Sequence, residues 1–109
     1  MNASPTPGKR RQMLEQFVQK NPADAFARYG LAMECVNEND FSAAEGHFAQ
    51  LIAAHPEYVA AYYQFGRMLG AQNRSDEARK ILIEGAARAA QAGDAHAQQE
   101  MQAALDELD

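Results

Sequence analysis

Three histidines and one cysteine are the side chains of this 109-residue sequence best suited to bind a metal ion or act as a nucleophile. His47, His55 and His96 have no spacing that would place them as metal ligands on a common face. Cys35 is the sole thiol, so it has no partner in the chain for a disulfide or a thiolate zinc site. We therefore expect no metal and no cofactor, surface histidines, and a Cys35 that packs as a small buried hydrophobe.

Paired carboxylates are the other residues that could do chemistry, as general acids and bases. Glu38 and Asp40 fall in an expected turn, and Asp106 and Glu107 fall at an expected frayed end, so neither pair is held rigidly. The chain also lacks a glycine-rich phosphate loop, a Gly-x-Ser-x-Gly turn and a His-Glu-x-x-His motif. The sequence therefore predicts a protein that is not an enzyme.

Binding, rather than catalysis, is the chemistry that the aromatic residues favour. Phe26, Tyr29 and Met33 are spaced by three and four residues, so they share one face of a helix. Aromatic side chains, methionine and arginine are enriched at protein interfaces. Two interpretations stay open: this face binds a partner, or Phe26 and Tyr29 simply cover a neighbouring helix.

A repeat of 34 residues organises the elements that must position these side chains. Pro22 and Pro56 are separated by this interval, and each follows a helix-like stretch. The same shift aligns Tyr29 with Tyr63, Leu31 with Phe65, Ala32 with Gly66, Asn39 with Asn73, Ala44 with Ala78, and Phe48 with Leu82. Such a period predicts stacked copies of one supersecondary unit.

Apolar spacing of three and four residues, together with 23 alanines and no run of period two, predicts helices and no strand. We expect six helices, at about residues 9–20, 22–36, 42–54, 57–71, 75–92 and 94–108. The side chains expected to cap their N-termini are Asn21, Ser42, Ser75 or Asp76, and Asp94. Asn39 and Asn73 predict turns that contain a left-handed residue.

Each expected helix carries an apolar stripe that predicts its buried face. In chain order the stripes are Met13, Leu14, Phe17 and Val18; Leu31, Ala32 and Cys35; Ala44, Phe48, Leu51 and Ile52; Tyr62, Phe65, Gly66 and Leu69; Ala78, Ile81, Leu82, Gly85, Ala86 and Ala89; and Ala97, Met101, Ala104, Leu105 and Leu108. Glycine inside a helix costs about 1 kcal/mol relative to alanine. Gly66 and Gly85 therefore predict places where two helices approach closely.

The residues at the repeat positions resemble a known family. One repeat reads Leu31-Ala32, Cys35, Ala44, Phe48, Leu51 and Pro56, and the next reads Tyr62, Phe65-Gly66, Leu69, Ala78, Leu82 and Gly85. This pattern is similar to the tetratricopeptide repeat, which has a large residue, Leu-Gly and Tyr in its first helix, and Ala, an aromatic, Ala and a late Pro in its second. Arg28 departs from the pattern, because it stands where the family has a large aromatic residue, and asparagine replaces glycine at both turns.

The resemblance implies an all-α fold, a short right-handed α-solenoid of antiparallel helix pairs with a C-terminal capping helix. We expect a flexible N-terminal segment at 1–8 and a single domain at 9–109. Within the domain we expect a degenerate half repeat at 9–21, repeats at 25–58 and 59–92, and the capping helix at 94–108.

The resemblance also implies a function, because members of this family bind extended peptides or partner helices in a concave groove. The groove is formed by the first helices of successive repeats. By position, its lining in this chain would be Phe26, Tyr29, Met33, Asn37, Tyr63, Gln64 and Arg67. We therefore expect a non-catalytic protein-interaction module whose partner is a protein or a peptide.

The composition limits the partners and leaves one alternative function open. A net charge of −5 argues against nucleic-acid binding, and no apolar run is long enough to span a membrane. The single cysteine favours a reducing compartment, so the cytoplasm is the expected location. Positive and negative blocks alternate along the chain, which would also allow the end faces of two copies to stack as a weak homodimer. The alternative function is therefore structural, through self-assembly.

Overall fold

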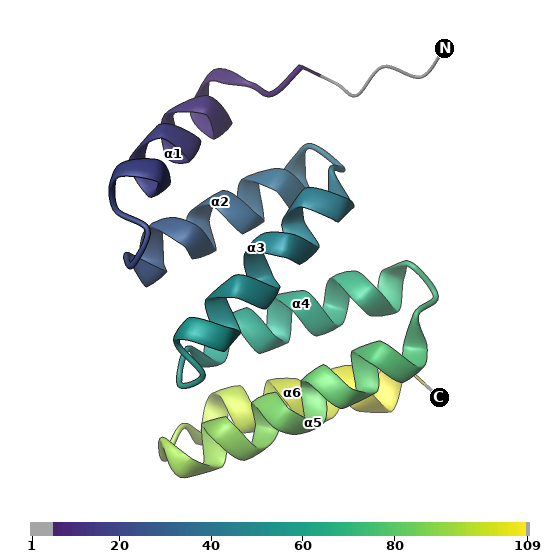
Figure 1. Cartoon of the computed structure of the whole chain (residues 1–109). Coiled ribbons are helices and arrows are strands. Elements are labelled where there is room, and N and C mark those ends of the chain that lie inside the picture. Colours follow the sequence, from purple (N-terminus) through teal and green to yellow (C-terminus); the bar gives the residue numbers. More distant parts are fainter. Residues whose placement is uncertain (1–5, 109) are drawn as a thin grey trace. The chain divides into compact units, whose positions relative to one another are not determined.

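The computed structural model describes residues 6–108, which form helices joined by short turns (Figure 1). In chain order these are α1 (Lys9–Lys20), α2 (Ala25–Asn37), α3 (Phe41–Ala54), α4 (Val59–Ala71), α5 (Ser75–Gln91) and α6 (Ala95–Glu107). No strand occurs between residues 6 and 108, and the expected all-α class is confirmed. Most of the flexible segment expected at 1–8 lies outside the described residues.

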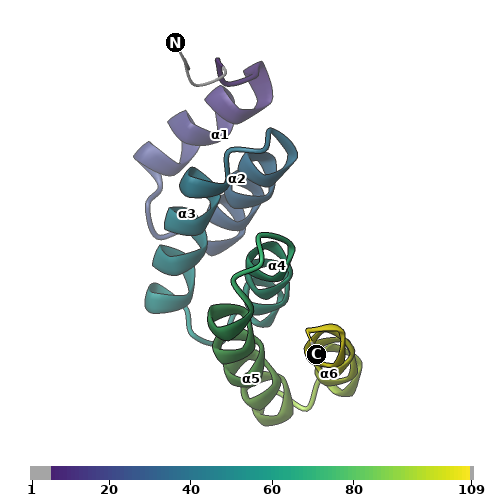
Figure 2. The same cartoon turned by 90° about the vertical axis from the view of Figure 1, so that its right-hand side faces the viewer.

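The chain divides into two compact units, one within Met1–Gln50 and one within Leu51–Asp109, with the boundary inside α3. In the first unit, α1 packs against α2. In the second unit, α4, α5 and α6 each pack against the other two, and Figures 1 and 2 show this group from two directions. Sequential antiparallel packing of this kind is that of an α-solenoid.

Three helices end in the same left-handed turn. Asn39, Asn73 and Gly93 have φ angles of 60°, 63° and 70°. In each case the N–H of the following residue donates to the carbonyl five residues earlier, as from Asp40 to Cys35 at 2.9 Å. The two asparagine turns are those that the 34-residue repeat predicts, and Gly93 ends α5 as expected.

The residue after each left-handed turn becomes the N-cap of the next helix, which corrects two expected caps. Asp40 and Asp94 each accept a hydrogen bond from the backbone N–H three residues on, at 3.3 and 3.0 Å. The cap at Asp94 was expected and is confirmed. The prediction that Ser42 caps a helix is wrong, because Ser42 lies inside α3. The prediction of Ser75 or Asp76 is wrong for the same reason, because both lie inside α5.

Asn21, the expected cap of α2, ends α1 instead. Its backbone N–H and its side-chain Nδ2 both donate to the carbonyl of Phe17, at 2.9 and 3.0 Å. Helix α2 begins after Asp24, whose Oδ1 accepts from the N–H of Ala27 at 2.9 Å. Pro22 therefore lies in the turn between the helices and not at the first helical position.

The buried face of α1 also differs from the expected stripe. Of the expected stripe, Val18 is buried and Leu14 is partly buried as predicted, but Met13 and Phe17 are 70% and 47% exposed. Arg11, which was not part of the stripe, is only 8% exposed. At about 100° per residue, positions 13 and 17 lie across the helix from positions 11 and 18. The physical reason is the set of ion pairs that Arg11 makes inside the first unit. In α2 to α6 the expected stripes are buried or partly buried throughout.

Arg11 joins α1 to the turn between α2 and α3 through three carboxylates. Its Nε donates to Glu15 at 3.1 Å, and its Nη1 donates to Glu38 at 3.3 Å and to Asp40 at 2.9 Å. Glu38 also accepts from the N–H of Gly8 at 2.8 Å. Burial alone would lower the pKa of Arg11, but its hydrogen bond to Asp40 raises that pKa above its usual range. The same bond lowers the pKa of Asp40.

The core of the second unit is built on contacts that only glycine permits. Tyr62, Leu82 and Met101, from α4, α5 and α6, form a buried cluster. A Cβ atom on Gly85 would lie 2.5 Å from Cβ of Tyr62 and 2.8 Å from Sδ of Met101. A Cβ atom on Gly66 would lie 2.5 Å from Leu82. The close approach predicted from these two glycines is confirmed.

Candidate functional site

The exposed face of α4 carries three of the residues predicted to bind a partner, Tyr63, Gln64 and Arg67. Tyr63 and Gln64 are partly buried, and Arg67 is exposed. The buried residues Tyr62 and Leu69 point to the opposite side, since helical positions 62 and 69 differ in phase from 63, 64 and 67 by about 100° or more. Helix α5 packs against the other side of α4, so it does not cover the face that carries Tyr63, Gln64 and Arg67.

A cavity of about 250 Å³ lies between α4 and α6. Its lining residues are Val59, Ala60, Tyr63 and Gln64 on the α4 side, and Asp94, His96, Ala97, Glu100 and Met101 on the α6 side. The α6 side was missed by the sequence prediction. A second application of the 34-residue shift would have found it, because that shift carries Tyr63 to Ala97 and Ala60 to Asp94.

A second cavity, of about 270 Å³, lies between the same two helices and Leu82 of α5. It is lined by Gly66, Arg67, Gly70, Ala71, Leu82, Ala104, Glu107 and Leu108. Arg67 connects the two cavities, because it lines this one and its Cζ lies 5.5 Å from the ring centroid of Tyr63, which lines the first. We call the residues lining both cavities the α4–α6 surface.

Acidic side chains give the α6 side of this surface its charge. Asp94 and Glu100 line the first cavity and Glu107 lines the second, and residues 94–109 contain no lysine or arginine. Nε2 of His96 lies 3.6 Å from Oε1 of Glu100. Arg67, held over the Tyr63 ring, supplies the cationic group on the α4 side. The surface thus combines an aromatic ring, one guanidinium and several carboxylates.

The remaining predicted binding residues lie on one face of α2, in the first unit. Phe26 is 76% exposed and Asn37 is exposed, while Tyr29 and Met33 are partly buried. Packing against a neighbouring helix would not leave Phe26 so exposed. Residues 26, 29, 33 and 37 lie within about 80° of one another around the helix axis, away from the buried Leu31 and Cys35.

The residues considered for catalysis and metal binding do not come together. Between residues 6 and 108 no group of three or more histidine, cysteine or acidic side chains is placed to hold a metal ion. Cys35 is buried, and burial raises the pKa of its thiol to about 11, so the thiol is protonated at neutral pH. The carboxylates of Glu38 and Asp40 both form ion pairs with Arg11. No helix in the described part of the chain is long and apolar enough to cross a membrane.

Known proteins share both the sequence pattern and the fold. The family model described as tetratricopeptide repeat matches residues 36–105. A TPR repeat-containing protein of Pseudomonas aeruginosa is 30% identical over 96 residues, which cover 88% of this chain and 91% of that protein.

Solved structures of similar proteins extend this likeness to three dimensions. The solution structure of a tetratricopeptide repeat domain protein from Salinibacter ruber has a TM-score of 0.77 and 31% identity, and covers 81% of this chain and 89% of that one. A solution structure of a protein from Bordetella parapertussis has a TM-score of 0.79 and 25% identity, and covers 99% of this chain and 89% of that one. With its repeat residues, its helix pairs and these relatives, the chain belongs to the tetratricopeptide repeat family.

Proposed function

We propose that this chain is a non-catalytic protein-interaction module that binds a peptide or a partner helix through the α4–α6 surface. Tetratricopeptide repeats generally bind proteins, which supports the class of function. The observation that carries the proposal is the pair of cavities between α4 and α6, connected by Arg67 over the ring of Tyr63. Aromatic and arginine side chains beside small cavities are the usual anchors of peptide and protein interfaces.

The charges of the α4–α6 surface favour a partner with apolar and basic side chains. Asp94, Glu100 and Glu107 attract lysine or arginine, and the ring of Tyr63 offers apolar contact. Gln64 can donate and accept hydrogen bonds to a peptide backbone. The same carboxylates and the net charge of −5 disfavour nucleic acid as a partner.

The exposed face of α2 is proposed as the contact surface of the first unit. Phe26 and Asn37 are exposed there, and Tyr29 and Met33 are partly exposed. Methionine and aromatic side chains adapt well to apolar partners. We place the module in the cytoplasm, and the single buried thiol supports a reducing compartment.

A peptide-display selection on the intact protein tests this function. Selected peptides are measured by calorimetry against wild type, Tyr63→Ala and Arg67→Ala, with Ile83→Ala as the control because Ile83 is 56% exposed on α5 and lines neither cavity. We expect the Tyr63 and Arg67 variants to bind at least about tenfold more weakly and the control to bind as wild type does. Equal weakening in Ile83→Ala, or none in Tyr63→Ala, would place the interface elsewhere.

Self-assembly is a second candidate, favoured by the exposed apolar side chains of α1. Met13 and Phe17 are 70% and 47% exposed at positions i and i+4, so they form one apolar patch. Sedimentation velocity over a range of protein and salt concentrations separates the two functions. Self-assembly through this patch predicts a dimer in the wild type and a monomer in Phe17→Ser. A wild type that is monomeric at all concentrations would exclude self-assembly.

A further inference from the structure

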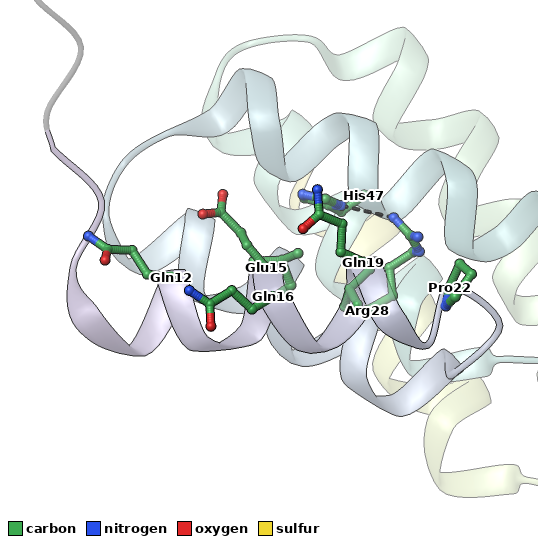
Figure 3. A pocket seen from close by; sticks show the side chains of 9 residues that line it. Gln12, Glu15, Gln16, Gln19, Pro22, Arg28 and His47 are labelled. Carbon is green, nitrogen blue, oxygen red and sulfur yellow. Dashed lines mark hydrogen bonds between the residues drawn. The ribbon is translucent and has the colours of Figure 1, made fainter.

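The first unit contains a polar pocket that neither the family resemblance nor the proposed function uses. Its volume is about 690 Å³, within the range of pockets that bind small ligands or short peptide segments. Figure 3 shows its labelled side chains, which come from α1, from the turn after α1, and from α2 and α3. The lining residues are Gln12, Glu15, Gln16, Val18, Gln19, Pro22, Arg28, Leu31 and His47.

Arg28 lines this pocket at a position that an aromatic ring fills in the next repeat. A shift of 34 residues carries Arg28 to Tyr62 and Pro22 to Pro56. Tyr62 is fully buried, and its hydroxyl donates to the carbonyl of Pro56 at 2.7 Å. Arg28 instead reaches toward α3, where its Nη1 donates to Oε1 of Gln50 at 2.6 Å. The change from an aromatic ring to a guanidinium thus accompanies an open space lined by polar groups.

The charge of Arg28 has no carboxylate partner among residues 6–108. Its two hydrogen-bond partners are Oε1 of Gln50 and, at 3.2 Å, Nδ1 of His47. Burial first, and then the charges of Arg28 and Arg11, lower the pKa of His47, so its ring is neutral at pH 7. Glu15 also lines the pocket, but its carboxylate is bonded to Arg11 at 3.1 Å. A partly buried guanidinium with neutral partners favours an incoming anion.

The rest of the pocket is suited to a peptide rather than to a free ion. Gln12, Gln16 and Gln19 follow one another along α1, over about 10 Å of helix axis, which is the length of about three extended residues. Gln12 donates to the carbonyl of Pro7 at 2.8 Å. The side-chain amides of Gln16 and Gln19 have no hydrogen-bond partner in the described part of the chain. Each glutamine amide both donates and accepts, which is what a peptide backbone requires.

We propose that this pocket binds an acidic peptide segment, with a glutamate or aspartate carboxylate on the guanidinium of Arg28 and the peptide backbone along the glutamine amides of α1. The pocket lies in the first unit and shares no residue with the α4–α6 surface. The two sites are therefore independent, and they select opposite charges in their ligands.

The test uses the isotope-labelled intact protein and nuclear magnetic resonance titration. The probes are a library of blocked hexapeptides with glutamate fixed at one position, the matched library with glutamine at that position, and free glutarate. We expect the glutamate library to shift the resonances of the pocket residues and to bind at least about tenfold more tightly than the glutamine library. Equal binding of the two libraries, shifts confined to α4 and α6, or glutarate binding as tightly as the glutamate library would each overturn the proposal.

Two variants separate binding from folding. Arg28→Tyr restores the aromatic residue of the next repeat, so it is expected to fold and to lose all binding of the glutamate library. Arg28→Gln keeps a hydrogen-bond donor near His47 and Gln50 without the charge, and it is expected to bind the two libraries equally. Arg10→Gln is the matched control, because Arg10 is on α1 with an 82% exposed side chain and does not line the pocket. Retained preference for glutamate in a folded Arg28 variant would refute the assignment.

Discussion

A methyl group at Gly85 should disrupt the second unit, although alanine is the better helix former. The Cβ atom introduced by Gly85→Ala would meet Cβ of Tyr62 at 2.5 Å, whereas carbon atoms in contact normally stand about 3.5–4.0 Å apart. Cβ of Tyr62 is fixed to the backbone of α4, so the contact is relieved only if α4 and α5 separate by about 1 Å.

The expected loss follows from two opposing effects. Overpacking of this kind costs about 1–3 kcal/mol, and we take the upper value because the clashing atom cannot rotate away. Replacing glycine by alanine inside a helix returns about 1 kcal/mol. Gly85→Ala should therefore lower the free energy of unfolding by about 2 kcal/mol, or the melting temperature by about 8 °C.

Gly46→Ala provides the matched control, because Gly46 lies inside α3 and a Cβ there meets nothing within 4 Å. This variant should gain about 0.5–1 kcal/mol. Both are measured by urea and thermal unfolding, followed by far-ultraviolet circular dichroism. If Gly85→Ala is as stable as Gly46→Ala, the close contact between α4 and α5 does not exist as described.

Four further predictions test other features of the chain. Arg11→Met leaves three carboxylates without their cation and should lower the free energy of unfolding by about 3 kcal/mol in urea; a change below about 0.5 kcal/mol would show that the network adds nothing. The pKa of His47 is below its ordinary 6.5, so the unfolded chain takes up a proton first as the pH falls, and stability should decrease from about pH 7 down to the lowered pKa. His47→Gln should flatten this part of the profile, and equal slopes would contradict the cause. Cys35, with its pKa near 11, should react with iodoacetamide at about pH 8 only after unfolding in urea; fast labelling of the folded protein would refute its burial. Removal of residues 94–109 takes Met101 out of the core and should abolish cooperative unfolding, whereas an unchanged melt would mean that α6 caps nothing.

Local patterns were enough to predict the helices and their C-terminal turns. Asn39 and Asn73 align under the repeat, and a left-handed residue at the end of a helix is a property of the local backbone. The N-caps predicted at Ser42 and at Ser75 or Asp76 were wrong for a related reason. Several residues near the start of a helix are able to cap it. The residue that does so is the one that directly follows the preceding left-handed residue, as Asp40 does in place of Ser42.

Pairing between distant side chains was beyond the reach of these patterns. The apolar stripe of α1 pointed to Met13 and Phe17, but the partners that bury Arg11 stand 27 and 29 residues away. In the candidate site, too, one part follows from local helix geometry and the other from distant packing. The phase of α4 predicts that Tyr63 and Arg67 share a face, whereas the acidic side formed by α6 depends on how two helices pack.

The asparagines at the two left-handed turns have a consequence for how this chain can change over generations. Most L-residues in that conformation cost about 1 kcal/mol or more, asparagine costs less because its side chain hydrogen-bonds locally, and glycine has almost no such cost. Asn39 and Asn73 are far apart in sequence and lie in different units, so gains at the two turns would add. A lineage of this chain therefore has room to accept destabilising changes on the proposed binding faces, because glycine at either turn would add stability without touching those faces.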